Sequence, residues 1–497
     1  MNRLKKLKIN TITSLIYQVI SIISGFVLPR LILKYYGSSV NGLISSITQF
    51  LAVITLCECG VGTVVQSSLY KPISVNDDDE ISRICKSAKK FFNKITIILL
   101  VYIIVLIIIF PNIVNKQYDA IFTSVLIIAI AIGLFSQYYL GIVYKLIINA
   151  AQLVYIQMIT NSITLILNVI ISIILMKNGF SIQVVKIFSA ILFVIQPIIY
   201  YIVVKKRFNI NNKIEYKTEP IKQKWNGFYQ HIATVVLENT DVIILTVLAS
   251  LKDVSIYSVY HLVTNGIKLF MVSITSGMKS LLGDMYVRNE KEKLDKVFSK
   301  FEWLIHFFVI LVYTITSILI VPFISIYTEG INDANYLQPI FGYIICFSMI
   351  VYMIRIPYNY MVSAAGHYKQ TQNSAIIEVI LNITISVILV LKLGLIGVAL
   401  GTLIAMLYRT TYLAKYVSKN ILYLDFKNYI YHMIFDIVGI IIMIITTQKI
   451  SIINNNYITW MGSSFIISLI CFTEWTILNI IFYNKQFYKF FLDKIRS

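Results

Sequence analysis

Cationic side chains recur inside stretches of the sequence that are otherwise apolar. One stretch carries four polar residues at three- and four-residue spacing, which on a helix share one face: Ser348, Tyr352, Arg355 and Asn359. A second stretch places Lys268 on one stripe with His261 and Asn265, and Arg30 ends a third stretch. Guanidinium and ammonium groups are the donors that a phosphate or diphosphate requires, and such contacts are stronger in a low-dielectric cleft than at a surface.

These residues predict a cleft that binds a diphosphate and its attached glycan. Its predicted lining is Arg30, Lys268, Arg355, Asn265, Asn359 and Tyr352. Ionisable groups inside a membrane are costly unless they line water or pair with one another. The alternative for Arg355 and Lys268 is therefore that they pair with acidic residues and only hold helices together.

Acidic residues in similar stretches predict a site for a coupling ion. The run Glu-Asn-Thr-Asp at 238–241 lies at predicted membrane depth, where it could take up a proton or a sodium ion. The candidates for ion coupling are Glu238, Asp241, Glu58 and Glu378. For the first two, a structural pair with Lys268 is the alternative. Asp436 is expected to pair or to face water.

No other set of residues has a spacing that indicates chemistry. We find no metal-ligand spacing, no glycine-rich phosphate loop and no Ser/His/Asp set. We therefore expect no catalytic residue, no metal and no cofactor beyond a coupling ion, H+ or Na+. His306 and His432 lie at predicted cytoplasmic helix ends, where an exposed or interfacial histidine is ordinary.

The composition indicates which elements must position these side chains. The 497 residues are 58% hydrophobic and 13% charged, which excludes a soluble, disordered or fibrous protein. At about 20 residues per span, this is material for about fourteen membrane helices. The runs lack the alternation of barrel strands. We predict an all-α, polytopic membrane protein with spans at 10–34, 40–66, 95–114, 119–144, 150–176, 181–204, 228–250, 255–279, 302–327, 338–363, 371–391, 394–416, 428–448 and 458–483.

The net charge of +20 follows the predicted topology. Most of the 43 Lys and Arg residues fall in alternate loops, on the same side as the two termini. This bias fits the positive-inside rule with both termini in the cytoplasm. The positive charge therefore does not indicate a nucleic-acid partner.

An internal repeat divides the chain. Aligned without gaps, 144–175 matches 358–389, and eleven of the 32 positions are identical. The alignment pairs the fifth predicted span with the eleventh, so each repeat is six spans long, and an even number of spans makes the two repeats parallel. We predict an N-terminal six-helix lobe over 1–210, a C-terminal six-helix lobe over 211–424, and two additional helices over 425–497. Two such halves around a central cleft are typical of a transporter with alternating access.

Three stretches carry a resemblance to a known family. They contain Leu28-Pro29-Arg30-Leu31 with Tyr35-Tyr36-Gly37 and Asn41-Gly42-Leu43, then Glu238-Asn239-Thr240-Asp241, and finally Ala364-Ala365-Gly366 with Gly397-Val398-Ala399-Leu400-Gly401-Thr402. These resemble the polysaccharide transporter, or Wzx-type flippase, family of the multidrug/oligosaccharidyl-lipid/polysaccharide exporter superfamily. The resemblance covers about residues 1–420.

The resemblance implies a function and a location. It implies that the chain flips undecaprenyl-diphosphate-linked oligosaccharide from the inner to the outer leaflet of a bacterial plasma membrane, for surface polysaccharide such as capsule. Its partners would be that substrate, membrane lipid, and the polymerase and glycosyltransferases of the same pathway. No site residue carries over by position.

Other functions stay open at this point. A lipid II flippase would use the same superfamily fold and the same headgroup chemistry. A multidrug/cation antiporter would be expected to have an acidic cleft. A membrane enzyme such as a polymerase or acyltransferase would need a sizeable outside loop, and the predicted outside connections are short. A membrane protein without transport is disfavoured by the duplication. We therefore expect a transporter rather than an enzyme.

Overall fold

The computed structural model of the chain is helical throughout its described part. It describes residues 3–58, 60–114, 117–211, 213–216, 218–221, 228–450 and 456–483, and no strand occurs among them. The prediction of an all-α, polytopic membrane protein is confirmed, because the helices coincide with the apolar runs of the sequence.

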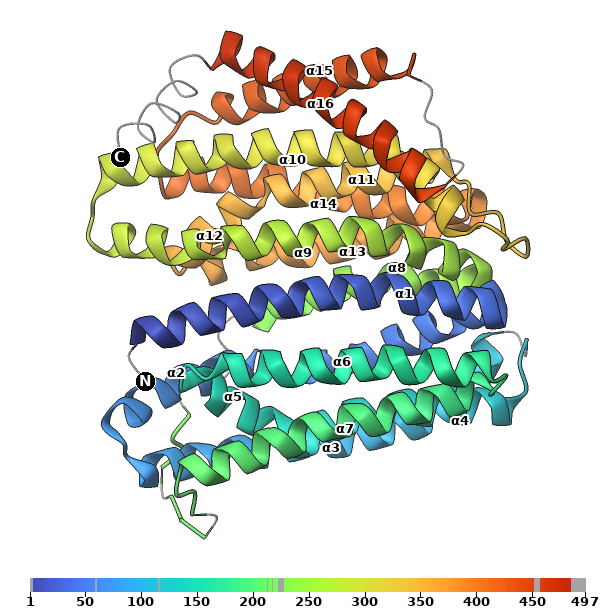
Figure 1. Cartoon of the computed structure of the whole chain (residues 1–497). Coiled ribbons are helices and arrows are strands. Elements are labelled where there is room, and N and C mark those ends of the chain that lie inside the picture. Colours follow the sequence, from blue (N-terminus) through green and yellow to red (C-terminus); the bar gives the residue numbers. More distant parts are fainter. Residues whose placement is uncertain are drawn as a thin grey trace. The chain divides into compact units, whose positions relative to one another are not determined.

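Sixteen α-helices follow one another along these residues (Figure 1). They are α1 (Arg3–Ala52), α2 (Val61–Val75), α3 (Asp78–Ile113), α4 (Ala120–Ser136), α5 (Ile142–Ala150), α6 (Val154–Lys177), α7 (Ile182–Arg207), α8 (Phe228–Leu248), α9 (Leu251–Val287), α10 (Lys291–Tyr327), α11 (Pro339–Ile354), α12 (Ile356–Ala364), α13 (Tyr368–Leu393), α14 (Leu395–Asn420), α15 (Lys427–Thr447) and α16 (Tyr457–Phe482). A 3-10 turn at Val53–Glu58 follows α1, and a π-helical turn at Gln137–Gly141 joins α4 to α5.

The described helices account for the number of membrane crossings predicted from the sequence, about fourteen. Twelve stretches among the described residues are long and apolar enough to cross a membrane. The first, Lys8–Glu58, has 51 residues, roughly twice what one crossing needs at about 1.5 Å per residue. Gly37 divides it, since its φ of 83° is not helical. Counting two crossings there and adding the 37-residue α9 gives fourteen.

The described helices form two compact units, Met1–Ser255 and Ile256–Ser497. Each has its own apolar core. Leu43, Phe92 and Ile147 are fully buried in the first unit, and Tyr313 and Met353 in the second. In the first unit α8 packs on α1, so this unit extends beyond the boundary predicted at residue 210. The division into lobes of six spans stays a prediction.

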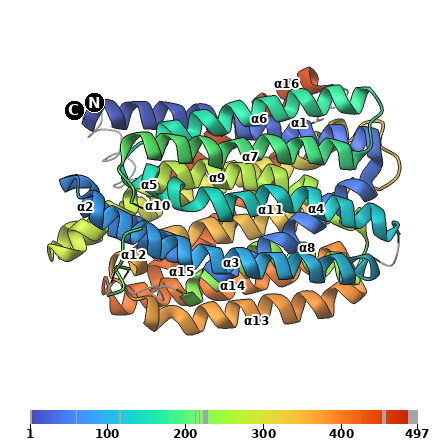
Figure 2. The ribbon, with the colours of Figure 1, turned by 90° about the horizontal axis from the view of Figure 1, so that it is seen from below.

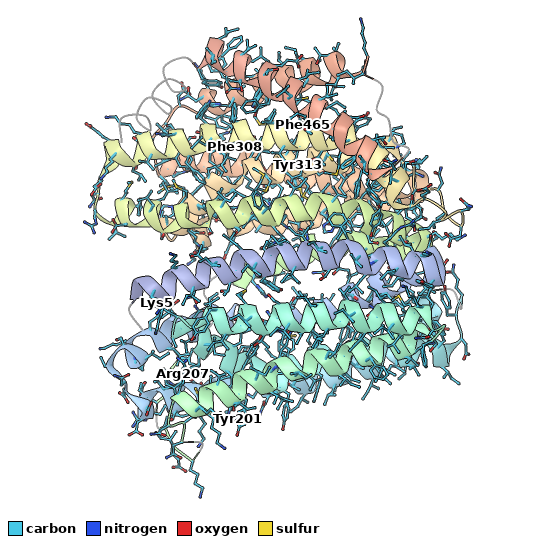
Figure 3. The ribbon with its side chains drawn as sticks, viewed as in Figure 1. Lys5, Tyr201, Arg207, Phe308, Tyr313 and Phe465 are labelled. Atoms are coloured by element: carbon cyan, nitrogen blue, oxygen red, sulfur yellow. The ribbon has the colours of Figure 1, made fainter. Side chains whose placement is uncertain are left out.

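Apolar side chains also cover the outer faces of the helices. Tyr313 is buried, whereas Tyr201, Phe308 and Phe465 point away from the helices that carry them (Figure 3). Exposed side chains of this size along membrane helices are suited to contact lipid tails. Within the first unit α6 and α7 run side by side (Figures 1 and 2).

The repeat seen in the sequence reappears in the helices. At the offset that aligns 144–175 with 358–389, α5 falls on α12 from its first residue to its last, and α6 and α13 begin together. With the offset shortened by a single position, α7 falls on α14 from end to end, and α3 and α10 begin together. The same order of helices is therefore built twice, and α15 and α16 follow the second copy.

Candidate functional site

Arg355 lies at a break between two helices of the second unit. α11 ends at Ile354 and α12 begins at Ile356. The cause is Pro357, which has no N–H to donate to the carbonyl four residues earlier and whose ring clashes with it. The sequence predicts one continuous span over 338–363, and Pro339–Ala364 is indeed one stretch long and apolar enough to cross a membrane, with this local interruption inside it.

The Arg355 side chain belongs to a buried ion triad. Its Nη1 donates to Oε1 of Glu378 on α13, and Nη1 of Arg409 on α14 donates to Oε2 of the same carboxylate at 2.7 Å. Arg355, Glu378 and Arg409 are 4%, 0% and 6% exposed. One carboxylate thus holds two guanidinium groups, using both of its oxygens.

Tyr352 connects this triad to Lys268. The Arg355 Cζ lies 4.7 Å from the centroid of the Tyr352 ring, and Lys268 Nζ on α9 lies 4.7 Å from the same centroid. Both distances are within the range of cation–π attraction. The structure therefore brings together three of the predicted cleft residues, Arg355, Lys268 and Tyr352.

The cluster formed by Lys268, Tyr352, Arg355, Glu378 and Arg409, called here the cationic cluster, carries more positive than negative charge. Three cations and one carboxylate leave a formal charge of plus two. The Arg355 Nε is buried without a hydrogen-bond partner among the described residues. An anion with several acceptor oxygens could accept a hydrogen bond from that donor.

Small residues hold α13 and α14, the helices that carry Glu378 and Arg409, at close range. Gly397 and Gly401 lie on the face of α14 that touches α13. A Cβ at Gly401 would meet Ser386 Oγ at 2.2 Å and Ser386 N at 2.7 Å. This is the small-residue spacing of close helix packing in membranes. Asn382 Nδ2 also donates to Thr402 Oγ1 at 2.8 Å across the same contact.

The other predicted cleft residues lie as follows. Asn265 and Asn359 are half-buried in the second unit, and the backbone N–H of Asn359 donates to the Arg355 carbonyl at 3.0 Å. Arg30 is half-buried on α1 of the first unit. Their contact with a substrate stays a prediction.

The four predicted ion-coupling residues lie in different surroundings. Asp241 is buried, whereas Glu238 is exposed. Glu58 accepts a hydrogen bond from the Tyr138 hydroxyl. Glu378 holds Arg355 and Arg409, an arrangement that favours a counter-ion over a site for a second cation. Their part in ion coupling remains untested.

Two features were not found from the sequence. One is Arg409, which lies near the end of a predicted span, where a basic residue is ordinary. The other is a cavity of about 330 Å³ in the first unit. Among its lining residues are Gly141, Lys145, Gln157, Asn161, Gln196 and Tyr200. Gln157 Oε1 is buried there without a hydrogen-bond partner in the described part of the chain.

The cavity occupies the position that the triad occupies in the second unit. At the offset that aligns α5 with α12, Gly141 corresponds to Arg355 and Thr164 to Glu378. At the offset that aligns α7 with α14, Gln196 corresponds to Arg409. Gln196 Nε2 donates to Thr164 Oγ1 at 2.6 Å, as Arg409 donates to Glu378. One contact is thus neutral in the first unit and charged in the second.

Comparisons with known proteins agree with this architecture. The model of the MatE family matches residues 228–388. The comparison with curated protein sequences finds no match.

Several solved structures superpose on the chain. Lipid II flippase MurJ in its inward closed conformation has a TM-score of 0.67 and 17% identity, over 96% of this chain and 99% of that one. An inward-facing multidrug resistance MATE family transporter of the MOP superfamily has a TM-score of 0.59 and 14% identity, over 81% and 95%. The Vibrio cholerae MATE transporter VcmN in its bent form has a TM-score of 0.55 and 13% identity, over 85% and 98%. At these identities the likeness shows the fold, which is the exporter fold expected from the resemblance.

Proposed function

We propose that this protein is a flippase for undecaprenyl-diphosphate-linked oligosaccharide, which it moves from the inner to the outer leaflet of a bacterial plasma membrane. The shared fold supports transport, because the solved structures with this fold are named as a lipid flippase and as multidrug transporters. The observation that carries the choice of substrate is the buried cationic cluster.

The charge of the cluster favours an anionic headgroup. A diphosphate offers several acceptor oxygens to Lys268, Arg355 and Arg409, and Tyr352 offers an aromatic face to a sugar ring. An organic cation would meet three cationic side chains and a single carboxylate among these five residues. The cluster therefore argues against drug/cation antiport, which was the third candidate.

Transport would proceed by alternating access. The cluster would hold the diphosphate through charge-assisted hydrogen bonds, while polar groups such as Asn265 and Asn359 would bind the glycan. An ion gradient or the membrane potential would drive the cycle, and the lipid tail would stay in the bilayer. The chain's own partners would then be membrane lipid and the enzymes that make and polymerise the glycan.

Lipid II is the second candidate. It presents the same diphosphate and a similar lipid, and the superposition with a lipid II flippase is the observation that favours it. The cationic cluster does not distinguish the two headgroups, since both place a diphosphate between lipid and sugar.

The test is translocation in proteoliposomes. Fluorescent undecaprenyl-diphosphate oligosaccharide, lipid II and an organic cation are compared for the wild type, Arg355→Gln, Lys268→Gln and the control Lys415→Gln, whose side chain is exposed on α14. Losing one charge-assisted contact of about 1.5 to 3 kcal/mol predicts roughly 10- to 150-fold weaker use of the oligosaccharide lipid. The control is expected to match the wild type.

Each other result has a defined meaning. Preference of the wild type for lipid II would replace the first candidate with the second. Export of the organic cation without movement of either lipid would refute the flippase function. Normal flipping by both cluster variants would refute the site.

A further inference from the structure

Two pairs of titratable residues face each other in the second unit, away from the cationic cluster. Glu302 and His306 lie four residues apart on α10, and His432 and Asp436 lie four residues apart on α15, so each pair shares a helix face. α10 packs against α15. We call these four residues the acid–histidine cluster. His306 and Asp436 are both 2% exposed, so the expectation that His306 lies at an exposed helix end is wrong.

The inner part of the cluster is a tightly joined pair. His306 Nδ1 lies 2.5 Å from Asp436 Oδ2. The other ring nitrogen of His306, Nε2, is buried and has no hydrogen-bond partner among the described residues. A buried imidazole nitrogen without a partner is a vacant position for a proton or for a donor.

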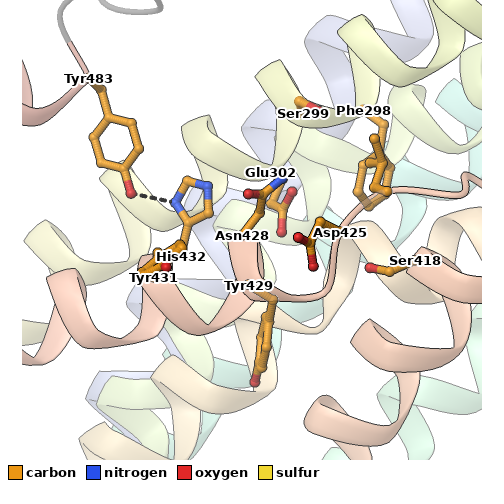
Figure 4. Close-up of a pocket in the computed structure, with 11 residues that line it drawn as sticks. Phe298, Ser299, Glu302, Ser418, Asp425, Asn428, Tyr429, Tyr431, His432 and Tyr483 are labelled. Atoms are coloured by element: carbon orange, nitrogen blue, oxygen red, sulfur yellow. Dashed lines mark hydrogen bonds between the residues drawn. The ribbon is translucent and has the colours of Figure 1, made fainter.

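The outer part of the cluster adjoins a cavity of about 290 Å³ (Figure 4). Glu302 and His432 line the cavity, and exposed residues such as Asp425, Asn428 and Tyr431 line it as well. His432 Nδ1 lies 2.7 Å from the Tyr483 hydroxyl. The His432 ring lies 5.1 Å from the His306 ring, centroid to centroid. A path of polar groups thus leads from the surface, through Glu302 and His432, to the buried His306 and Asp436.

The chemistry of the cluster suits a proton. Its four members can all bind or release one, and two buried carboxylates without protons would leave an uncompensated charge. The aromatic groups that face it are Tyr358 from α12, Tyr429 from α15 and Tyr483 after α16, and Asp425 lies at the cavity. Within the described residues no group of three His, Cys, Asp or Glu side chains could hold a metal ion. We propose that the acid–histidine cluster is a proton-binding site that couples the proposed transport to a proton gradient.

A single side chain connects this cluster to the cationic cluster. The hydroxyl of Tyr358, which is 1% exposed, donates to Glu302, and Tyr358 lies three residues after Arg355. Protonation of Glu302 would weaken this hydrogen bond, because a carboxylic acid is a poorer acceptor than a carboxylate. The change would reach α12 one turn from the helix break at Arg355. The coupling therefore rests on the proposed function, whereas the binding of the proton does not.

The first test measures the proton without a substrate. Infrared difference spectra of the purified protein between about pH 6 and about pH 8 report carboxyl groups that gain or lose a proton. We expect a carboxyl signal in the wild type that Asp436→Asn or Glu302→Gln removes or shifts. The matched control is Trp303→Phe, which removes a buried 3.1 Å hydrogen bond from Trp303 Nε1 to Asn479 Oδ1 without changing a titratable group. A signal unchanged in both acid variants would overturn the proton site.

The second test measures coupling in proteoliposomes. A pH gradient is expected to accelerate flipping of the oligosaccharide lipid by the wild type and by Trp303→Phe at least about fivefold. Asp436→Asn and Tyr358→Phe are expected to keep the rate without a gradient and to lose the acceleration. If a pH gradient accelerated flipping by both variants as much as by the wild type, the coupling would be overturned. If the wild type flips no lipid but exchanges an organic cation for protons, and Asp436→Asn abolishes that exchange, the proton site stands and the proposed function falls.

Discussion

Replacing the carboxylate that joins Arg355 to Arg409 is the sharpest test of the cationic cluster. Glu378→Gln keeps the size of the side chain and removes the shared acceptor of two guanidinium groups. Removing one partner of a buried ion pair costs about 3 to 5 kcal/mol of folding stability. At about 1.4 kcal/mol per factor of ten, this lowers the folding equilibrium constant roughly 100- to 4,000-fold. The formal charge of the cluster rises by one.

A double-mutant cycle separates this effect from a change of packing. Arg409→Gln is expected to cost less, about 1.5 to 3 kcal/mol, because Glu378 then keeps Arg355. Glu378→Gln combined with Arg409→Gln is expected to cost about 1 to 3 kcal/mol less than the sum of the two. Reversible unfolding in mixed micelles, followed by the loss of helix, provides the free energies.

The control cycle uses an exposed ion pair of the same unit. Arg288 Nε lies 2.9 Å from Asp284 Oδ1 on α9, and the two side chains are 65% and 57% exposed. Its coupling energy should stay below about 0.5 kcal/mol, because exposed pairs on a helix contribute little. Additive effects of Glu378→Gln and Arg409→Gln, within about 0.5 kcal/mol, would refute the account of the triad as one charge network.

Three further predictions concern packing, the aromatic contact and topology. Gly401→Val should destabilise the protein by about 1 to 3 kcal/mol in thermal unfolding, because its Cβ would overlap Ser386, whereas Gly462→Ala, with open space around it in the interior of α16, should not destabilise it and should gain up to about 1 kcal/mol. Tyr352→Phe should keep binding of the diphosphate lipid in a titration, and Tyr352→Leu should lose about 0.5 to 2 kcal/mol with the ring that contacts two cations. In a chain without its five native cysteines, Asn209→Cys should react with an impermeant maleimide only after permeabilisation, and labelling of intact cells would reverse the predicted topology.

Features that are local in sequence could be predicted from it. Apolar runs predicted the membrane helices, since a span is recognised by about 20 neighbouring residues. Helical spacing predicted that Tyr352 and Arg355 share a face, and the gapless alignment of 144–175 with 358–389 predicted that helices recur. Lys268 and Tyr352 were both predicted to line one cleft, and the structure places them in contact.

Pairings across the fold could not be predicted in the same way. Glu378 lies on α13 and Arg409 on α14, and the sequence contains no signal that joins either to Arg355. His306 and Asp436 lie 130 residues apart, on helices that the hydropathy pattern treats as unrelated. Their types are visible in the sequence, but their burial depends on which helix faces meet. The spacing of the two pairs on α10 and α15 was the signal that could have suggested a shared site.

The comparison of the two repeats explains why both clusters lie in the second unit. Tyr144 in the first repeat corresponds to Tyr358 in the second, and Lys89 of α3 corresponds to Glu302 of α10. Lys89 Nζ lies 5.0 Å from the centroid of the Tyr144 ring. The contact between α3 and α5 in the first unit therefore corresponds to the contact between α10 and α12 in the second. Its chemistry differs, because the tyrosine meets a cation in one unit and donates to a carboxylate in the other.

The second unit therefore combines two changes at corresponding positions with one addition. Neutral Gly141, Thr164 and Gln196 of the first repeat are replaced by the charged triad, the lysine beside the tyrosine is replaced by Glu302, and α15 adds His432 and Asp436. A lysine cannot act as the proton acceptor for a tyrosine hydroxyl while it is charged, whereas a carboxylate accepts that bond and can lose it on protonation. Binding of an anion and its control by a proton would thus depend on the same short helix, α12. This helix begins directly after Arg355 of the cationic cluster, and it contains Tyr358, which donates to Glu302 of the acid–histidine cluster.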